Sequence, residues 1–154
     1  MINHKYMHRI IIIMALAVAS LLSIDAYAQT GLNVAPFFSE EYASEKKLTS
    51  VTLTGEKCGK MGLRVYKSVS VTDDAPLADR IRRAVAKDGA KATLKEVAYR
   101  GGELYFGLYS MGGKGAGRRY LIFLNRRPVG QEKTILVYIE GNVSEETVKK
   151  LIKK

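Results

Sequence analysis

The residues of this chain best suited to chemistry are the glycines and cations of residues 112–119. The run Gly-Gly-Lys-Gly-Ala-Gly-Arg-Arg combines a flexible backbone with the positive side chains of Lys114, Arg118 and Arg119. Backbone N–H groups in such a run, together with Lys and Arg, are suited to hold a phosphate or another anion. A nucleotide-type phosphate loop, however, opens a helix and carries Ser or Thr after its lysine. Here Gly115 follows the lysine and a strand pattern follows the arginines, so a hairpin loop and an anion site both remain open.

A second basic pair, Arg126 and Arg127, stands in the link between two later strand patterns. With Lys114, Arg118 and Arg119, this pair completes the five candidate anion-binding residues. The whole chain has 25 Lys and Arg against 15 Asp and Glu, a net charge of +10. Such a charge attracts anionic surfaces, but it also suits a solvated surface that keeps the protein soluble. The charges are spread along the chain, which leaves both interpretations standing.

Histidine is absent from residues 29–154, because His4 and His8 both lie near the N-terminus. That part of the chain also has no Trp and a single cysteine, Cys58. Ser-His-Asp and Cys-His nucleophile arrangements are therefore excluded there, as are zinc sites built on His or on several thiolates. We expect no metal, no cofactor and no enzymatic activity. Cys58 suits a passive, partly buried thiol, with pairing between chains or a reactive thiol as the alternatives.

Carboxylates supply the one catalytic hypothesis. An unusual carboxylate hydrolase needs two acids that converge in a cleft, roughly 5 to 10 Å apart. The candidate acids in the strand-rich half of the chain are Glu96, Glu103, Glu132 and Glu140.

Residues 1–28 have the three-part pattern of a secretory signal peptide. Lys5 and Arg9 precede an apolar run, and Ala26-Tyr27-Ala28 offers a cleavage site before Gln29. A membrane-spanning helix needs about 20 apolar residues, more than this run supplies. We expect cleavage after Ala28 and a periplasmic or secreted protein, which makes nucleic acid an unexpected partner.

Alternating apolar residues predict the elements that position these side chains. A period of two is typical of half-buried strands, and in 103–110 it sets Leu104, Phe106 and Leu108 against Tyr105, Gly107 and Tyr109. Strands are predicted at 49–54, 63–72, 93–100, 103–110, 118–124 and 133–140, with phase slips near Lys67 and between Leu94 and Val97. Helices are predicted at 36–48, 74–89 and 144–152.

The pattern therefore predicts an α+β fold with a mainly antiparallel sheet of about six strands and helices packed on one face. Tyr105, Tyr109 and Tyr138 are expected to screen the other face. Residues 29–35 are predicted to be a flexible leader and 36–154 a single domain.

The whole arrangement resembles a family. The Thr-Ser-Val-Thr-Leu strand, the Asp-rich entry to a helix and Ile135-Leu136-Val137-Tyr138-Ile139 before a Lys-rich terminal helix carry the resemblance. The chain is similar to small exported domains of unknown function from gut-associated bacteria. The resemblance implies the fold and the exported location, and it transfers no catalytic residues.

Two binding functions follow as hypotheses. The first is a non-catalytic module for anionic envelope ligands, lipid or glycan, held by the five basic residues above. The alternative is a protein-interaction or inhibitor domain that acts through the exposed sheet face.

Overall fold

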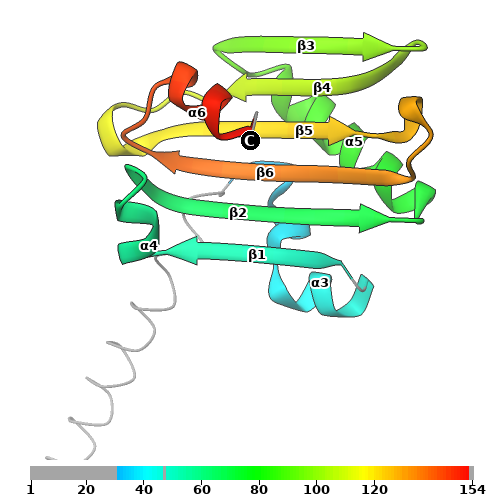
Figure 1. The fold of residues 1–154 in the computed structure, drawn as a ribbon, viewed down its shortest axis with the longest axis horizontal. Coiled ribbons are helices and arrows are strands. Elements are labelled where there is room, and N and C mark those ends of the chain that lie inside the picture. The colour runs from blue at the N-terminus through cyan, green and yellow to red at the C-terminus, as the bar shows by residue number, and fades with distance from the viewer. Residues whose placement is uncertain (1–30, 47, 153–154) are drawn as a thin grey trace, which may run out of the picture. The chain divides into compact units, whose positions relative to one another are not determined.

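The computed structural model describes residues 31–46 and 48–152, so the predicted signal peptide lies outside the described residues. Within them the chain forms one antiparallel sheet in the order β1-β2-β6-β5-β4-β3 (Figure 1). Its six strands are β1 (Thr49–Thr54), β2 (Leu63–Thr72), β3 (Leu94–Arg100), β4 (Glu103–Ser110), β5 (Arg118–Asn125) and β6 (Lys133–Gly141). The helical elements are η1 (Ala35–Phe38), α3 (Glu40–Lys46), α4 (Glu56–Gly59), α5 (Ala75–Gly89), η2 (Gly115–Gly117), η3 (Arg127–Val129) and α6 (Glu145–Ile152). The predicted α+β fold is confirmed.

Two blocks of strands make the sheet. β1 and β2 form a hairpin through α4, and β3 to β6 form a meander. α5 connects the blocks, and the pairing of β2 with β6 joins them at the centre of the sheet. The β3–β4 turn at Gly101 and Gly102 has positive φ at both residues, the backbone that a two-residue hairpin requires.

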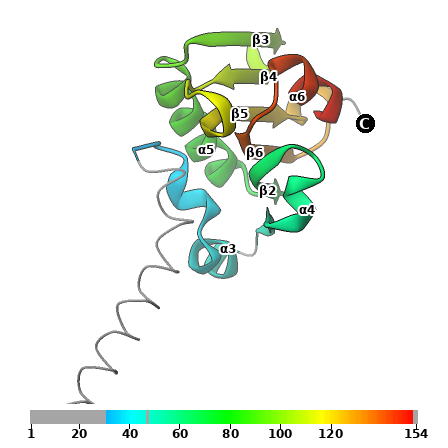
Figure 2. The same ribbon diagram turned by 90° about the vertical axis from the view of Figure 1, so that its left-hand side faces the viewer.

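One face of the sheet is covered by α5, η1 and α3 (Figure 2). Asp74 caps α5, because its carboxylate accepts a hydrogen bond from the Leu77 N–H at 3.0 Å. Leu77, Ile81 and Val85, spaced four residues apart along α5, are buried on the sheet side of the helix. We call this side the α5 face.

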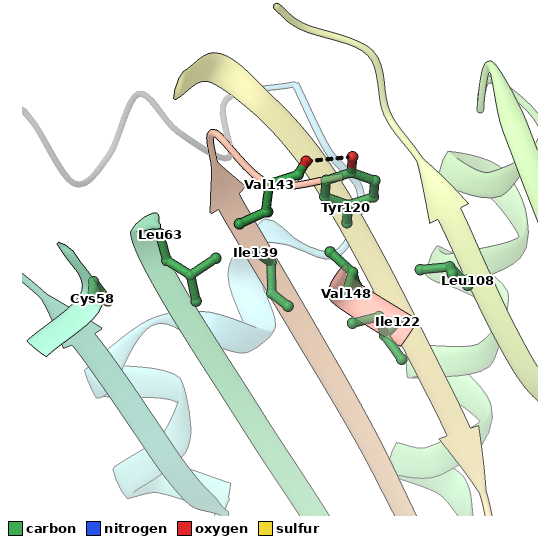
Figure 3. Close-up of a cluster of buried hydrophobic side chains, with 8 residues drawn as sticks. All are labelled: Cys58, Leu63, Leu108, Tyr120, Ile122, Ile139, Val143 and Val148. Carbon is green, nitrogen blue, oxygen red and sulfur yellow. Dashed lines mark hydrogen bonds between the residues drawn. The ribbon is translucent and has the colours of Figure 1, made fainter. Parts of the chain in front are cut away.

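The other face carries α4 and α6, whereas the sequence predicted helices on one face only. Val148 of α6 and Cys58 of α4 are fully buried in one cluster with sheet residues (Figure 3). The other members of that cluster are Leu63, Leu108, Tyr120, Ile122, Ile139 and Val143. Leu151, an apolar residue of the same helix α6, is 40% exposed. We call this side the α6 face.

The predicted helix from Pro36 is broken at Ser39 into η1 and α3. Phe37 and Phe38 are buried, and the Phe38 ring lies 6.3 Å from that of Tyr138. The Ser39 hydroxyl accepts from the Tyr42 N–H at 3.1 Å. Ser39 therefore caps α3 at the break.

Part of the predicted flexible leader is held in place. The Asp88 carboxylate, at the end of α5, accepts hydrogen bonds from Asn33 N, Asn33 Nδ2 and Val34 N at 2.8, 2.7 and 3.0 Å. Val34 is fully buried. The compact unit accordingly begins at Leu32 rather than at Pro36.

Register shifts lie away from the predicted phase slips. In β2 the shift is between Leu63 and Val65 rather than near Lys67. Between β3 and β4, Ala98 pairs with Phe106 but Tyr99 pairs with Leu104, so Tyr105 is an extra residue in β4. Such a β-bulge reverses the facing of the residues beyond it. Leu104 and Phe106, predicted to share a face, lie on opposite faces.

Candidate functional site

The five predicted anion-binding residues do not gather in one place. Lys114 and Arg118 flank η2 at the start of β5, whereas Arg126 and Arg127 follow the end of β5. A strand of eight residues spans roughly 25 Å at about 3.3 Å per residue. The five residues therefore form two separate groups at opposite ends of the strand.

Three of these five cations have structural contacts. Arg119 Nη2 donates to the Met111 carbonyl at 3.0 Å, and Arg127 Nε lies 3.4 Å from the Glu132 carboxylate. Arg126 Nη1 donates to the Tyr105 hydroxyl at 3.1 Å. Lys114 and Arg118 are exposed and have no ion pair with another described residue.

A buried carboxylate, which sequence reasoning considered only as a hydrolase acid, lies on the α5 face. Glu140 is 2% exposed, forms an ion pair with Arg64 and accepts a hydrogen bond from the Tyr138 hydroxyl at 3.0 Å. Burial raises the pKa of Tyr138 to about 12, although Arg119 and Arg64 nearby act in the opposite direction. A buried charge needs such partners because desolvation is costly. The ion pair between Arg64 and Glu140 therefore links β2, at its bulge, to β6.

The other candidate carboxylates each have a partner of their own. Glu96 lies 2.5 Å from Lys149 Nζ, Glu132 pairs with Arg127, and Glu103 accepts from Asn125 Nδ2 at 3.4 Å. The Glu96 side chain, on β3, lies on the α6 face, whereas that of Glu140, on β6, lies on the α5 face. Glu96 and Glu140 therefore do not converge in one cleft.

Cys58 is the passive thiol that the sequence favoured. It is fully buried, and its Sγ donates to the Leu53 carbonyl at 2.9 Å. Burial raises the pKa of the thiol, against a smaller lowering by a backbone hydrogen bond from Tyr66. A thiol that resists ionisation is a poor nucleophile.

A surface cavity of about 430 Å³ lies between α5 and the β3–β4 hairpin. Its charged lining residues include Asp79, Arg82 and Arg127. Asp79 lies 3.5 Å from Arg82 and 3.9 Å from Arg127. Opposite charges in the lining thus offset one another, which gives this cavity little preference for an anion.

Two further features are lacking in the part of the chain that the structure describes. No group of three or more His, Cys, Asp or Glu side chains is arranged to hold a metal ion. None of the described helices has the length and apolar character needed to cross a membrane.

The α6 face has a half that none of the described helices covers. α6 lies over the buried cluster, while the ends of β5 and β6 near their connecting loop are bare in Figure 1. One row of paired residues crosses this bare half, and every member is at least partly exposed. From edge to edge the row is Ala98, Phe106, Leu124, Ile135, Ser70 and Thr49.

Phe106, Leu124 and Ile135 in this row, with the partly exposed Val137 beside them, make an apolar surface that we call the open face. Directly paired residues on antiparallel strands point to the same side. Phe106 and Val137 also pack against the buried cluster. The open face is therefore continuous with the core under α6.

Cations border the open face along its outer side. Strand alternation places Lys133, two residues before Ile135, on this side. Arg126 directly follows β5, and its guanidinium donates to the Tyr105 hydroxyl on the same side. Arg126 N donates to the Lys133 carbonyl at 2.8 Å, and the Arg100 guanidinium lies 5.8 Å from the centre of the Tyr105 ring. We call Arg100, Arg126 and Lys133 the basic border.

Tyr105 stands within this border because of the bulge in β4. The three tyrosines that were predicted to screen one face of the sheet, Tyr105, Tyr109 and Tyr138, therefore do not share a face. Tyr105 is on the α6 face, but Tyr109 and Tyr138 are buried on the α5 face. Sequence reasoning missed Arg100 and Lys133, and the period-two pattern around Leu124 and Ile135 was the signal that could have located Lys133.

Fold and site together define a small α+β domain that presents half of an antiparallel sheet face with a cationic border. The chain matches the family of unknown function DUF6108 over residues 21–152 and belongs to that family. No curated protein matches it. The expected membership of a domain family of unknown function is confirmed, while the association with gut bacteria stays a prediction.

Proposed function

We propose that this domain is a non-catalytic binding module that docks a protein partner on the open face. The observation that carries the proposal is the row of Phe106, Leu124 and Ile135, which leaves apolar side chains partly exposed on three central strands. Contiguous apolar surface with a polar rim is typical of interaction sites. The partner surface would be apolar at its centre.

The basic border supports a partner with acidic residues around that apolar centre. Arg100, Arg126 and Lys133 lie on one side of the open face, and charge complementarity guides association and register at interfaces. Tyr and Arg are also the residues that most often contribute strongly at protein interfaces. Tyr105, held by Arg126, supplies such an aromatic side chain at the border.

Anionic lipid or glycan is a weaker hypothesis on the same geometry. Such ligands would use the five basic residues together, but these residues lie at opposite ends of β5. An exported, envelope-facing setting suits either kind of ligand and remains part of the proposal.

The test is an NMR titration with a synthetic peptide that alternates Leu with Glu. We expect amide shifts to change at Phe106, Leu124 and Ile135, and reversal of the border charge by Arg126→Glu to weaken binding at least tenfold. Arg118→Glu is the matched control, because it reverses an arginine at the other end of the same strand. Its affinity should stay within about twofold of the parent.

Two results would overturn the proposal. One is a set of shift changes located away from the open face. The other is equal weakening by Arg118→Glu and Arg126→Glu, with phosphatidylglycerol vesicles or a sulfated glycan binding more tightly than the peptide. That second outcome would instead support adsorption of the whole cationic surface to an anionic envelope ligand.

A further inference from the structure

β3 is an edge strand with unusually exposed side chains. All seven of its residues are exposed. Leu94, Val97 and Tyr99 are 53%, 36% and 67% exposed. They account for three of the seven large hydrophobic side chains that are exposed among the described residues. An edge strand of this kind offers unpaired backbone N–H and C=O groups to another strand.

Of the common protections of an edge, β3 has charged side chains, those of Lys95, Glu96 and Arg100, but lacks others. Proline is absent from the strand, and the bulge places its extra residue in β4 rather than in β3. The opposite edge is different, because β1 contacts both α3 and α4 and consists mainly of Thr and Ser. Of the two edges of this sheet, β3 is the one suited to pairing.

We propose that β3 pairs with β3 of a second copy of this chain, so that two six-stranded sheets join edge to edge as a symmetric dimer. In an antiparallel pair, residues directly opposite each other point to the same side of the sheet. A two-fold axis perpendicular to the sheet keeps the α6 faces of both copies on one side. The axis must then pass between a residue and the same residue of the second copy. Directly opposed residues share a side of the sheet, whereas neighbouring residues along one strand point to opposite sides.

Charge selects among these registers. Centring the pair on Glu96 sets two carboxylates opposite each other, and centring it on Val97 sets Glu96 opposite Ala98. Centring it on Ala98 sets Glu96 of each copy opposite Arg100 of the other. Opposite charges at directly opposed positions stabilise a strand pair, whereas like charges destabilise it.

The register centred on Ala98 also pairs the exposed apolar side chains. Val97 then lies opposite Tyr99 on the α5 face, and this contact occurs twice across the axis. Glu96 and Arg100 lie on the α6 face, where Glu96 contacts Lys149 and Arg100 lies over Tyr105. Both side chains are therefore already on the side that the register requires.

The first test is sedimentation equilibrium of residues 29–154, the chain left by the predicted cleavage, and of two charge variants. We expect a dimer for the parent chain, and at least tenfold weaker association for Glu96→Arg and for Arg100→Glu, since each variant sets like charges opposite each other. An equimolar mixture of the two variants should dimerise again, because every opposed pair then has opposite charge. Far-UV circular dichroism of each variant checks that the fold is kept.

A second test fixes the register. Ala98→Cys should form a disulfide between copies under mild oxidation, because the two residues face each other on the axis. Thr52→Cys, at the exposed β1 edge, is the matched control and should remain monomeric. A parent chain that is monomeric at 100 µM or above would overturn the proposal. So would failure of the mixed variants to associate, or equal cross-linking of the two cysteine variants.

These tests use no partner and leave Phe106, Leu124 and Ile135 unchanged. Arg100 also belongs to the basic border, so Glu96→Arg and the two cysteine variants are the ones that separate dimerisation from docking. Dimerisation at β3 can therefore fail while docking on the open face stands, and the reverse is also true.

Discussion

The Arg126 guanidinium donates a 3.1 Å hydrogen bond to the Tyr105 hydroxyl and thereby fastens the loop after β5 to the bulge in β4. Neither residue is fully buried. This hydrogen bond holds the Arg126 side chain of the basic border in one position. A preorganised side chain loses less entropy on binding.

A double-mutant cycle on Tyr105→Phe and Arg126→Gln should measure this contact. Each variant loses the hydrogen bond, so we expect a coupling of about 0.5 to 1 kcal/mol in the free energy of unfolding. Urea denaturation gives the four values. Arg118→Gln, as control, should change stability by less than about 0.5 kcal/mol. Strictly additive effects of the two substitutions would show that the contact contributes nothing.

Removing the Asp88 carboxylate should release the segment before η1. Asp88→Ala leaves the Asn33 and Val34 N–H groups without their acceptor, and each unsatisfied buried group costs about 1 to 3 kcal/mol. We expect a loss of about 2 to 4 kcal/mol in unfolding free energy and faster amide exchange at Val34. Asp79→Ala on the same helix is the control, because Asp79 makes only partly exposed ion pairs. Unchanged exchange at Val34 would contradict the assignment.

Stability should fall at high pH through Tyr138. Its pKa is raised to about 12 in the folded protein, against about 10 in an unfolded chain. The unfolded state therefore loses its proton first, so the stabilisation present below pH 10 is lost as pH rises towards 12. The size is about 2 to 3 kcal/mol.

The measurement is urea denaturation from pH 9 to 12, comparing the parent chain with Tyr138→Phe. The variant should show a shallower fall over this range. Tyr99→Phe, at a tyrosine that is 67% exposed, should follow the parent profile. Parallel profiles for the parent and Tyr138→Phe would rule out Tyr138 as the source.

Tyr109 occupies space that two glycines leave free. A Cβ on Gly107 would lie 2.5 Å from the Tyr109 ring, and a Cβ on Gly89 would meet the same ring at 2.5 Å. Gly107→Ala and Gly89→Ala should each lower the melting temperature, with a cost of about 1 to 3 kcal/mol from overpacking. Gly59→Ala has nothing within 4 Å of its new Cβ and should be close to neutral. A neutral Gly107→Ala would show that the ring can move aside.

The strands could be predicted because their signal is local. The ranges 49–54, 63–72 and 103–110 were predicted as the structure has them, since a period of two depends only on neighbouring residues. The caps are local as well. The Ser144 hydroxyl accepts from the Thr147 N–H at 3.2 Å, as the sequence at the start of α6 predicts.

The candidate site depended on contacts between distant parts of the chain. Arg119 and Arg126 look equivalent in the sequence, but the first is held by Met111 and the second stands on the border of the open face. No local pattern predicted the bulge at Tyr105, because it exists only relative to the partner strand β3.

The sequence by itself determined that this chain makes an α+β sheet domain, because alternation and capping act within a few residues. Only the tertiary structure decided which face stays bare, how the Asp88 carboxylate holds Asn33 and where the cations gather. Those outcomes depend on register and on packing between residues far apart in the chain, and a single extra residue in one strand changes them.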